Sequence, residues 1–157
     1  MDKKTIKAII DVIKDVSDRP GLYGAEINGK YIYFTDGYVI VRLEMGAYEG
    51  LRPFPDAHNV WVSGEQFKEI YKGLGTRDVC LTVKNEHGEH PDWIELWKRW
   101  SDAEAIAEAV PIRPDTFKKL APFGDMLMQL TENKMGQKLV AFNGKGINAF
   151  ACPLARF

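Results

Sequence analysis

The sequence predicts an α+β protein in which amphipathic helices cover one side of an antiparallel sheet. Three observations carry this prediction. Apolar residues recur at helical spacing over residues 3–17, and residues 31–46 (YIYFTDGYVIVRLEMG) are nearly continuous β-branched and aromatic sequence around one short turn. A unit of strand, helix and strand beginning at residue 60 recurs fifty residues later. Helices alternating with antiparallel strands are typical of the α+β class.

The first predicted element is a helix over residues 3–17. Its buried stripe has helical spacing and consists of Ile6, Ile9, Ile10, Ile13 and Val16. Lys3, Lys7 and Lys14 lie together on the flank of the opposite face. The segment from Asp18 to Gly21 contains a proline and a glycine and is expected to end the helix.

Three strands are expected next, at about 22–28, 30–35 and 38–45. Asn28-Gly29 is a strong signal for a two-residue hairpin loop. The Thr35-Asp36-Gly37 turn has two interpretations. It is either a hairpin turn in which Asp36 bonds its own backbone, or part of a binding site. Residues 46–58 contain several glycine and proline residues and are predicted to form a connecting loop.

The second unit begins with a short strand, Val60–Val62. Ser63 and Gln66 form a capping box that starts a helix, and a strand is expected at 79–83, followed by a polar loop at 85–91. Residues 93–97 are predicted to form a further strand, whereas 101–109 fit either a short helix or a linker. The buried face of the helix is predicted to consist of Phe67, Ile70, Tyr71 and Leu74.

The third unit repeats the second at the offset of fifty residues. The helix segments FKEIY and FKKLA correspond at three of their five positions, with Phe67 at the place of Phe117, Lys68 at that of Lys118 and Ile70 at that of Leu120. The N-terminal segment IKAII shows the same pattern. Strands are expected at 138–143 and 147–152, joined by a glycine hairpin at 143–146. Because each helix buries its apolar stripe on the sheet, the helix lysines are expected to face away from it.

Composition narrows the range of functions. The hydrophobic fraction is 45% and the charged fraction 27%, typical of a folded soluble protein, and no apolar run reaches the ~20 residues of a membrane helix. The N-terminus does not resemble a secretory signal, so a cytoplasmic protein with Cys80 and Cys152 as free thiols is expected. The net charge of -1 excludes a global basic field, so DNA binding would depend on local lysines. The lysines predicted to contact phosphates without sequence preference are Lys3, Lys7, Lys14, Lys68, Lys72, Lys118 and Lys119.

No catalytic constellation stands out, and no cofactor or metal is predicted. His87 and His90 lie among Glu86, Glu89 and Asp92, so a metal-dependent nucleic-acid enzyme using the His87–Glu95 region is an alternative; a solvated loop explains the same residues. Trp93, Trp97 and Trp100 fit either base stacking or packing in a core. A structural module with no DNA role is a further alternative.

Three phrases of the sequence resemble the bacterial DNA polymerase III sliding clamp (beta subunit) family. YIYFTDGYVIVRL resembles a turn-centred strand pair of the clamp, HPDWIELW resembles the phrase that ends a clamp domain, and INAFACPLARF resembles the clamp C-terminus. The resemblance implies a sliding-clamp-like fold. Residues 1–98 would form one clamp-like domain of two helix-plus-strand units, and residues 99–157 a third unit like the closing half of the last domain. Three units are an odd number, so either one unit pairs across chains in a homo-oligomer or the units pack differently than in a clamp.

The resemblance also implies a function and a second site. The protein would act in DNA replication without being an enzyme, and would either tether partners to double-stranded DNA or mimic a clamp to bind replication proteins. In the family, the turn and the C-terminal strand together line a cleft for short peptides of partner proteins. Val39 stands where the family usually has a basic residue, and Ala155 is extra relative to the family's final phrase. The residues at the matching places are Thr35, Gly37, Tyr38, Val39, Ile40, Cys152, Pro153, Leu154, Arg156 and Phe157.

Overall fold

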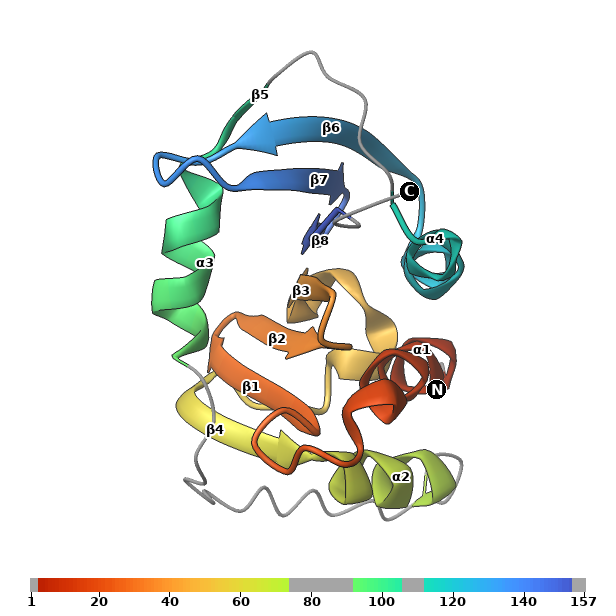
Figure 1. Ribbon diagram of the computed structural model, residues 1–157. Helices are drawn as coiled ribbons and strands as arrows, with labels where there is room; N and C mark the ends of the chain where they lie inside the picture. The colour runs from red at the N-terminus through yellow and green to blue at the C-terminus, as the bar shows by residue number, and fades with distance from the viewer. Residues whose placement is uncertain (1–2, 74–91, 106–111, 154–157) are drawn as a thin grey trace.

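The computed structural model describes residues 3–73, 92–105 and 112–153 and shows an α+β protein built on one eight-stranded antiparallel sheet (Figure 1). The strand order is β4-β1-β2-β3-β8-β7-β6-β5. The strands are β1 Gly24–Gly29, β2 Tyr31–Thr35, β3 Val39–Glu44, β4 Ala57–Ser63, β5 Glu104–Ala105, β6 Met126–Glu132, β7 Lys138–Gly144 and β8 Ile147–Ala151. The α-helices are α1 Lys4–Ile13, α2 Gly64–Gly73, α3 Trp93–Ser101 and α4 Pro114–Leu120. Four short 3-10 turns complete the described elements: η1 Lys14–Val16, η2 Met45–Ala47, η3 Glu49–Leu51 and η4 Ala121–Phe123.

Two similar halves meet at the middle of the sheet. In each half a helix is followed by an antiparallel meander of three strands: α1 precedes β1-β2-β3, and α4 precedes β6-β7-β8. The last strands of the two meanders pair with each other, so that Val41 of β3 lies opposite Ala149 of β8. The sheet therefore runs across the boundary expected near residue 98, and the division into domains at 1–98 and 99–157 remains a prediction.

Helices α1, α2 and α4 lie on one side of the sheet, and α3 lies on the other (Figure 1). The predicted stripe of α1 is buried apart from Ile10, which is half-buried. This stripe packs against alternate residues of the strands, including Ile32, Phe34 and Val41, and forms the larger core. We call this side of the sheet the helix face, because the three repeated helices form it.

The predicted strand at residues 93–97 is wrong, because these residues begin helix α3. Asp92 caps the helix by accepting a hydrogen bond from the backbone N–H of Glu95 at 3.1 Å. Trp93, Trp97 and Trp100 are four and three residues apart and so share one side of the helix. Trp93 and Trp97 are buried in a second core on the outer side of the sheet with Tyr33, Ile40 and Trp61, and Trp100 is half-buried against Phe150. The tryptophans are therefore packing residues, and the alternative of base stacking is not supported for Trp93 and Trp97.

One local prediction is confirmed in detail and a second in part. The backbone N–H of Gln66 donates to Ser63 Oγ at 3.2 Å, and the backbone N–H of Ser63 donates to Gln66 Oε1 at 2.8 Å, which is the reciprocal capping box at the start of α2. The β1–β2 hairpin has a two-residue loop, although its residues are Gly29 and Lys30 rather than Asn28 and Gly29. Gly29 has φ +64°, a conformation that favours glycine.

Other expectations concern residues that the structure does not describe. The predicted strand at 79–83, with Cys80, and the predicted loop at 85–91, with both histidines of the metal alternative, lie outside the described residues. Residues 101–109 are described only in part, as the end of α3 and the short strand β5. None of the helices in the described ranges has the length and apolarity needed to cross a membrane.

Candidate functional site

The Thr35-Asp36-Gly37 turn is held by its own side chains. Asp36 Oδ1 accepts hydrogen bonds from the backbone N–H groups of Tyr38 and Val39, both at 2.8 Å. The Thr35 hydroxyl donates to the carbonyl of Val39 at 2.7 Å and accepts from the N–H of Gly37 at 3.0 Å. Gly37 has φ +95°, which favours glycine at this place. The expectation that Asp36 bonds its own backbone is confirmed, and the turn has a structural role.

The second carboxylate oxygen of Asp36 belongs to a buried charge cluster that the sequence did not reveal. Lys119 Nζ lies 2.6 Å from Asp36 Oδ2, 2.5 Å from Asp15 Oδ2 and 3.0 Å from Asp115 Oδ2. The side chains of Lys119 and Asp36 are 6% and 3% exposed, whereas those of Asp15 and Asp115 are 42% and 46% exposed. The cluster therefore ties the turn to η1 and α4 through one ammonium group.

The environment keeps Lys119 charged. Burial alone would lower the pKa of Lys119, but hydrogen bonds with Asp15, Asp36 and Asp115 outweigh this effect and raise the pKa above its ordinary value. Its hydrogen bond with Lys119 in turn lowers the pKa of Asp115. The four side chains thus form a paired ionic cluster at neutral pH, with Lys119 as the shared donor.

The same carboxylates are the one group in the described residues with the spacing of a metal site. Oxygen atoms of Asp15, Asp36 and Asp115 lie within 4.8 Å of one another. The ammonium of Lys119 lies within hydrogen-bonding distance of all three, so a cation already fills the place between them. This cluster is therefore a salt-bridge centre, and it offers no open coordination position of the kind that metal catalysis needs.

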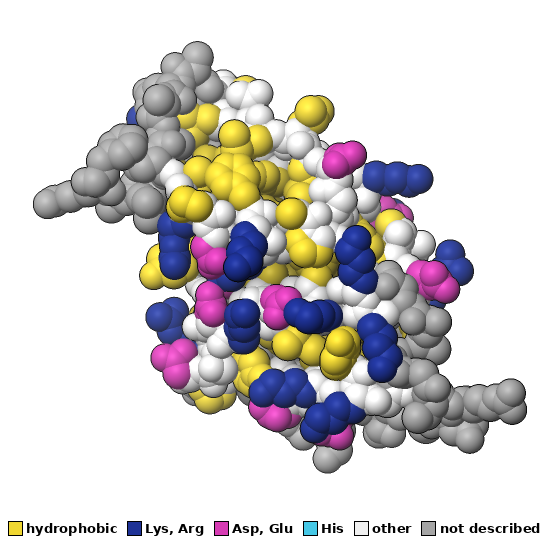
Figure 2. Space-filling model, turned by 90° about the vertical axis from the view of Figure 1, so that its right-hand side faces the viewer, with side chains coloured by type: hydrophobic (Ala, Val, Ile, Leu, Met, Phe, Trp, Pro, Cys, Tyr) yellow, Lys and Arg dark blue, Asp and Glu magenta, His cyan; other side chains and the backbone are white. Residues whose placement is uncertain are grey.

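The predicted lysines on the helix face are exposed, with Lys119 as the exception (Figure 2). Lys119 was expected on an exposed face, but its ammonium is buried in the cluster. Lys7 is 2.8 Å from Asp11, Lys68 is 3.3 Å from Glu65, and Lys3 stacks over the ring of Tyr71 at 5.5 Å. Lysines and acids thus alternate over this face in Figure 2, and most of these pairs are exposed enough to exchange with solvent ions.

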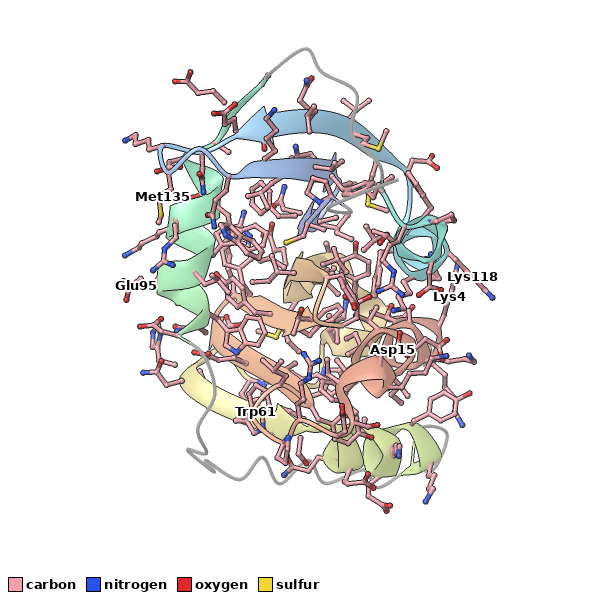
Figure 3. The ribbon with its side chains drawn as sticks, in the orientation of Figure 1. Lys4, Asp15, Trp61, Glu95, Lys118 and Met135 are labelled. Atoms are coloured by element: carbon pink, nitrogen blue, oxygen red, sulfur yellow. The ribbon has the colours of Figure 1, made fainter. Side chains whose placement is uncertain are left out.

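Positive charge nevertheless predominates on these helices. Residues 3–16, α2 and α4 together contain eight lysines and five acidic residues, whereas the whole chain has a net charge of -1. Figure 3 shows Lys4 and Lys118 on the helix side of the molecule, away from the sheet, while Glu95 lies on α3 on the other side. A polyanion would therefore meet a locally favourable charge on the helix face. The lysines of this face that remain exposed are Lys3, Lys4, Lys7, Lys14, Lys68, Lys72 and Lys118.

The turn and the end of β8 lie side by side, as the resemblance implied. The backbone N–H of Cys152 donates to the carbonyl of Tyr38 at 2.9 Å. The Tyr38 side chain is 50% exposed, and the guanidinium carbon of Arg113 lies 4.0 Å from its ring centroid. Burial, followed by the negative charge of Asp36, raises the pKa of the half-buried Cys152 thiol, so this free cysteine is a thiol rather than a reactive thiolate at neutral pH.

Other residues proposed for the cleft have different surroundings. Thr35 is buried, Val39 lies in the larger core, and Ile40 lies in the outer core beneath α3. Ile40 is among the residues expected to line the cleft, but its side chain is 1% exposed and covered. Gly37 is exposed and Pro153 is half-buried, so both remain at the surface near Tyr38. Leu154, Arg156 and Phe157 lie outside the described residues.

The outer side of the sheet holds an arginine among aromatic rings. Arg42 lies between the rings of Tyr31 and Trp97, with its guanidinium carbon 4.4 and 4.6 Å from their centroids. It also donates to Asn148 Oδ1 at 2.8 Å, which links β3 to β8. Burial raises the pKa of the neighbouring Tyr33 hydroxyl. The contact of Arg42 with Trp97 thus helps to fix α3 on the sheet.

The sequence matches no protein-family model and no curated protein. One solved structure that matches is that of DNA polymerase III subunit beta from Borrelia burgdorferi in complex with a natural product, with a TM-score of 0.48 and 10% identity over 100% of this chain and 62% of that chain. The present chain therefore spans 62% of the length of the matched chain. At this identity and TM-score the likeness says nothing about DNA or partner binding, and those arguments rest on the residues described above.

Proposed function

We propose that this chain is a non-enzymatic, sliding-clamp-like protein of DNA replication that contacts duplex DNA through its helix face. The observation that carries the proposal is the common orientation of α1, α2 and α4, whose exposed lysines all lie on one side of the sheet. Lysines scattered over three helices suit contact with the phosphates of a duplex, because phosphates repeat regularly and carry no sequence information.

The pairing of these lysines with acids predicts weak binding. Lys7, Lys68 and Lys72 each lie within 3.4 Å of a carboxylate, and phosphates would have to compete with these pairs. The dissociation constant should therefore lie near the weak end of the non-specific range, about 10⁻⁴ M at physiological salt. Weak, sequence-neutral contact is the property that a protein needs if it is to move along DNA while a partner is attached.

The partner site of this proposal is the surface around Tyr38. The exposed ring of Tyr38, stacked with Arg113, lies beside the end of β8, so a short extended peptide could contact an aromatic ring, a cation and backbone groups together. Replication proteins with clamp-binding peptides are the proposed partners. The chain then acts either as a tether or as a mimic that competes for the same peptides.

A salt titration with a fluorescent duplex tests the DNA part of the proposal. Anisotropy should show equal binding to two duplexes of unrelated sequence, with affinity that falls steeply as salt rises. The triple charge reversal Lys7→Glu, Lys68→Glu and Lys118→Glu should abolish binding while the circular dichroism spectrum stays unchanged.

A matched control distinguishes the effect of the helix-face lysines on DNA binding from the effect of total charge. Lys30→Glu, Lys98→Glu and Arg99→Glu make the same change in net charge on the β1–β2 loop and on α3. This control should retain DNA binding within about threefold, because screening weakens distant charges. Equal loss in both triple variants, or no loss in the helix-face variant, would show that these lysines are only a solvated surface.

The peptide part has its own test. A fluorescent clamp-binding peptide should bind the wild type and bind at least tenfold more weakly to Tyr38→Ala, which removes the exposed ring but leaves the backbone hydrogen bonds of the turn. A chain truncated after Cys152 tests the expected contribution of the C-terminal residues in the same titration. If no peptide binds the folded wild type, the turn has only a structural role, whatever the DNA titration shows.

A further inference from the structure

Two arginines lie against the exposed turn at Tyr38. Arg19 Nη1 is 3.5 Å from the point that a Cβ atom on Gly37 would occupy. The guanidinium carbon of Arg113 is 4.0 Å from the centroid of the Tyr38 ring. Gly37 and Tyr38 are consecutive and both exposed, so the two guanidinium groups reach the same short stretch of surface. We call Arg19 and Arg113 the arginine pair.

The backbone holds both members of the arginine pair in place. The carbonyl of Arg19 accepts a hydrogen bond from the N–H of Tyr23 at 3.0 Å, and the N–H of Arg19 donates to the carbonyl of Val16 at 2.9 Å. Arg113 is the N-cap residue of α4, and Pro114 after it restricts its backbone to the extended conformation that it has, with ψ 127°. The guanidinium groups are therefore attached to fixed points beside the turn, which reduces the entropy lost when a ligand binds them.

The acidic residues nearest to the turn are bonded to other groups. Asp36 is 3% exposed, and its two oxygens accept from the backbone of the turn and from Lys119. Asp15 and Asp115 each have an oxygen within 3.0 Å of the Lys119 ammonium. The guanidinium groups of the arginine pair take part in no hydrogen bond or ion pair within the described part of the chain. Their planar sets of N–H donors are therefore open to a carboxylate from outside.

We propose that the arginine pair makes the surface around Tyr38 specific for acidic peptides, in which a side-chain carboxylate binds the guanidinium groups and a neighbouring apolar side chain packs on the Tyr38 ring. This inference rests on the proposed peptide site and names the chemistry of its partner. Charge complementarity supports an acidic occupant, because a guanidinium group binds a carboxylate through two parallel hydrogen bonds. The ring of Tyr38 is 50% exposed and supplies the apolar contact, while Gly37 has no side chain to obstruct a peptide backbone.

The same arrangement discriminates against neutral peptides. A peptide with asparagine in place of aspartate keeps its contact with the ring but loses the charge-assisted hydrogen bonds, which are roughly twice as strong as neutral ones. Three extended residues span ~10 Å, so an acidic side chain one or two residues from an apolar one can reach an arginine while the apolar one stays on Tyr38. We expect the loss of the peptide's charge to weaken binding about tenfold.

Fluorescence anisotropy with two versions of a clamp-binding peptide would test this specificity. The versions differ in one residue beside the large apolar residue of the peptide, which is aspartate in one and asparagine in the other. Wild type should bind the aspartate version about tenfold more tightly. The double variant Arg19→Gln and Arg113→Gln should bind both versions equally. The control Arg99→Gln, on α3 at the other side of the sheet, should retain the preference.

The ratio of the two affinities is the readout, because a structural defect in the turn would weaken both peptides alike. If wild type binds both versions equally, the acidic specificity is overturned while the peptide site stands. If neither version binds, the peptide site and its specificity fail together. A fluorescent duplex completes the comparison, and the double arginine variant should bind it within about threefold of wild type. A loss as large as that of the triple lysine variant would assign the arginine pair to DNA phosphates and overturn the proposal.

Discussion

Replacement of Lys119 by methionine should destabilise the protein by about 3 kcal/mol. Methionine retains most of the length of the side chain but removes the ammonium that Asp36, Asp15 and Asp115 share. The main cost comes from Asp36, because its carboxylate is 3% exposed and would be left buried with no counter-charge. Removal of one partner of a buried pair costs ~3–5 kcal/mol. The low end applies here, since Asp36 Oδ1 retains its two backbone N–H donors.

The half-exposed partners should add little to this loss. Asp15 and Asp115 are 42% and 46% exposed, so water can solvate them once Lys119 is gone. Each such pair contributes ~0–1 kcal/mol. Asp36→Asn tests whether the buried charge of Asp36 causes the main loss, because asparagine can still accept the backbone hydrogen bonds of the turn but carries no charge. In that background Lys119→Met should cost only about 1 kcal/mol.

Urea unfolding followed by tryptophan fluorescence would measure these changes. A loss of 3 kcal/mol corresponds to a fall in midpoint of about 1.5 M for a slope of ~2 kcal/mol/M. Lys118→Met is the matched control, because Lys118 is the exposed neighbour on the same helix, and its replacement should change stability by less than ~0.5 kcal/mol. The reasoning would be refuted if Lys119→Met cost less than about 1 kcal/mol, or if it cost as much in the Asp36→Asn background as in the wild type.

Three further predictions concern separate elements. Asp115→Asn should lower the free energy of unfolding near neutral pH, because Lys119 lowers the pKa of Asp115 in the folded protein. The stabilisation by Asp115 is present above its ordinary pKa of 3.8 and is lost as pH falls through its lower pKa in the folded protein, so the difference between variant and wild type should shrink below pH 3.8. Chemical unfolding at several pH values measures this difference. Ser63→Ala should cost ~1 kcal/mol in urea unfolding, since it removes the side-chain half of the capping box. Trp97→Ala should cost ~3–5 kcal/mol because Trp97 is 6% exposed, and the half-buried Trp100→Ala should cost clearly less; similar losses for both would contradict the described packing of α3.

Local sequence signals predicted most of the inner architecture. The stripe of α1, the strands around the Thr35-Asp36-Gly37 turn and the Ser63–Gln66 capping box each depend on residues a few positions apart, and such short-range physics can be read from the sequence. The hydrogen bonds of Asp36 within its own turn are also short-range interactions of this kind. The fold class, with the three repeated helices on one side of an antiparallel sheet, follows from the order of these elements.

The wrong predictions for residues 93–97 and for Lys119 have specific physical causes. Residues 93–97 were expected to form a strand because aromatic and β-branched residues dominate WIELW, but the helical spacing extends to Trp100 and Asp92 supplies the cap. Lys119 is adjacent to Lys118, which fits the repeat, so the sequence predicts exposed lysines at both positions. Its partners Asp15 and Asp36 lie 104 and 83 residues away in the sequence, and no local pattern indicates contacts at such a distance.

The β3–β8 pair has a consequence for how the chain folds. Leu43 and Ile147 lie opposite each other in the middle of the sheet, although more than a hundred residues separate them. Closure of a loop of this length costs about 4 kcal/mol of chain entropy, which has to be met before the strands gain from pairing. During synthesis the first half can form its own meander, but its inner edge at β3 stays unpaired until β8 has left the ribosome. In that interval β3 is an exposed strand rich in valine, isoleucine and leucine, and a nascent chain of this protein should be most prone to aggregation there.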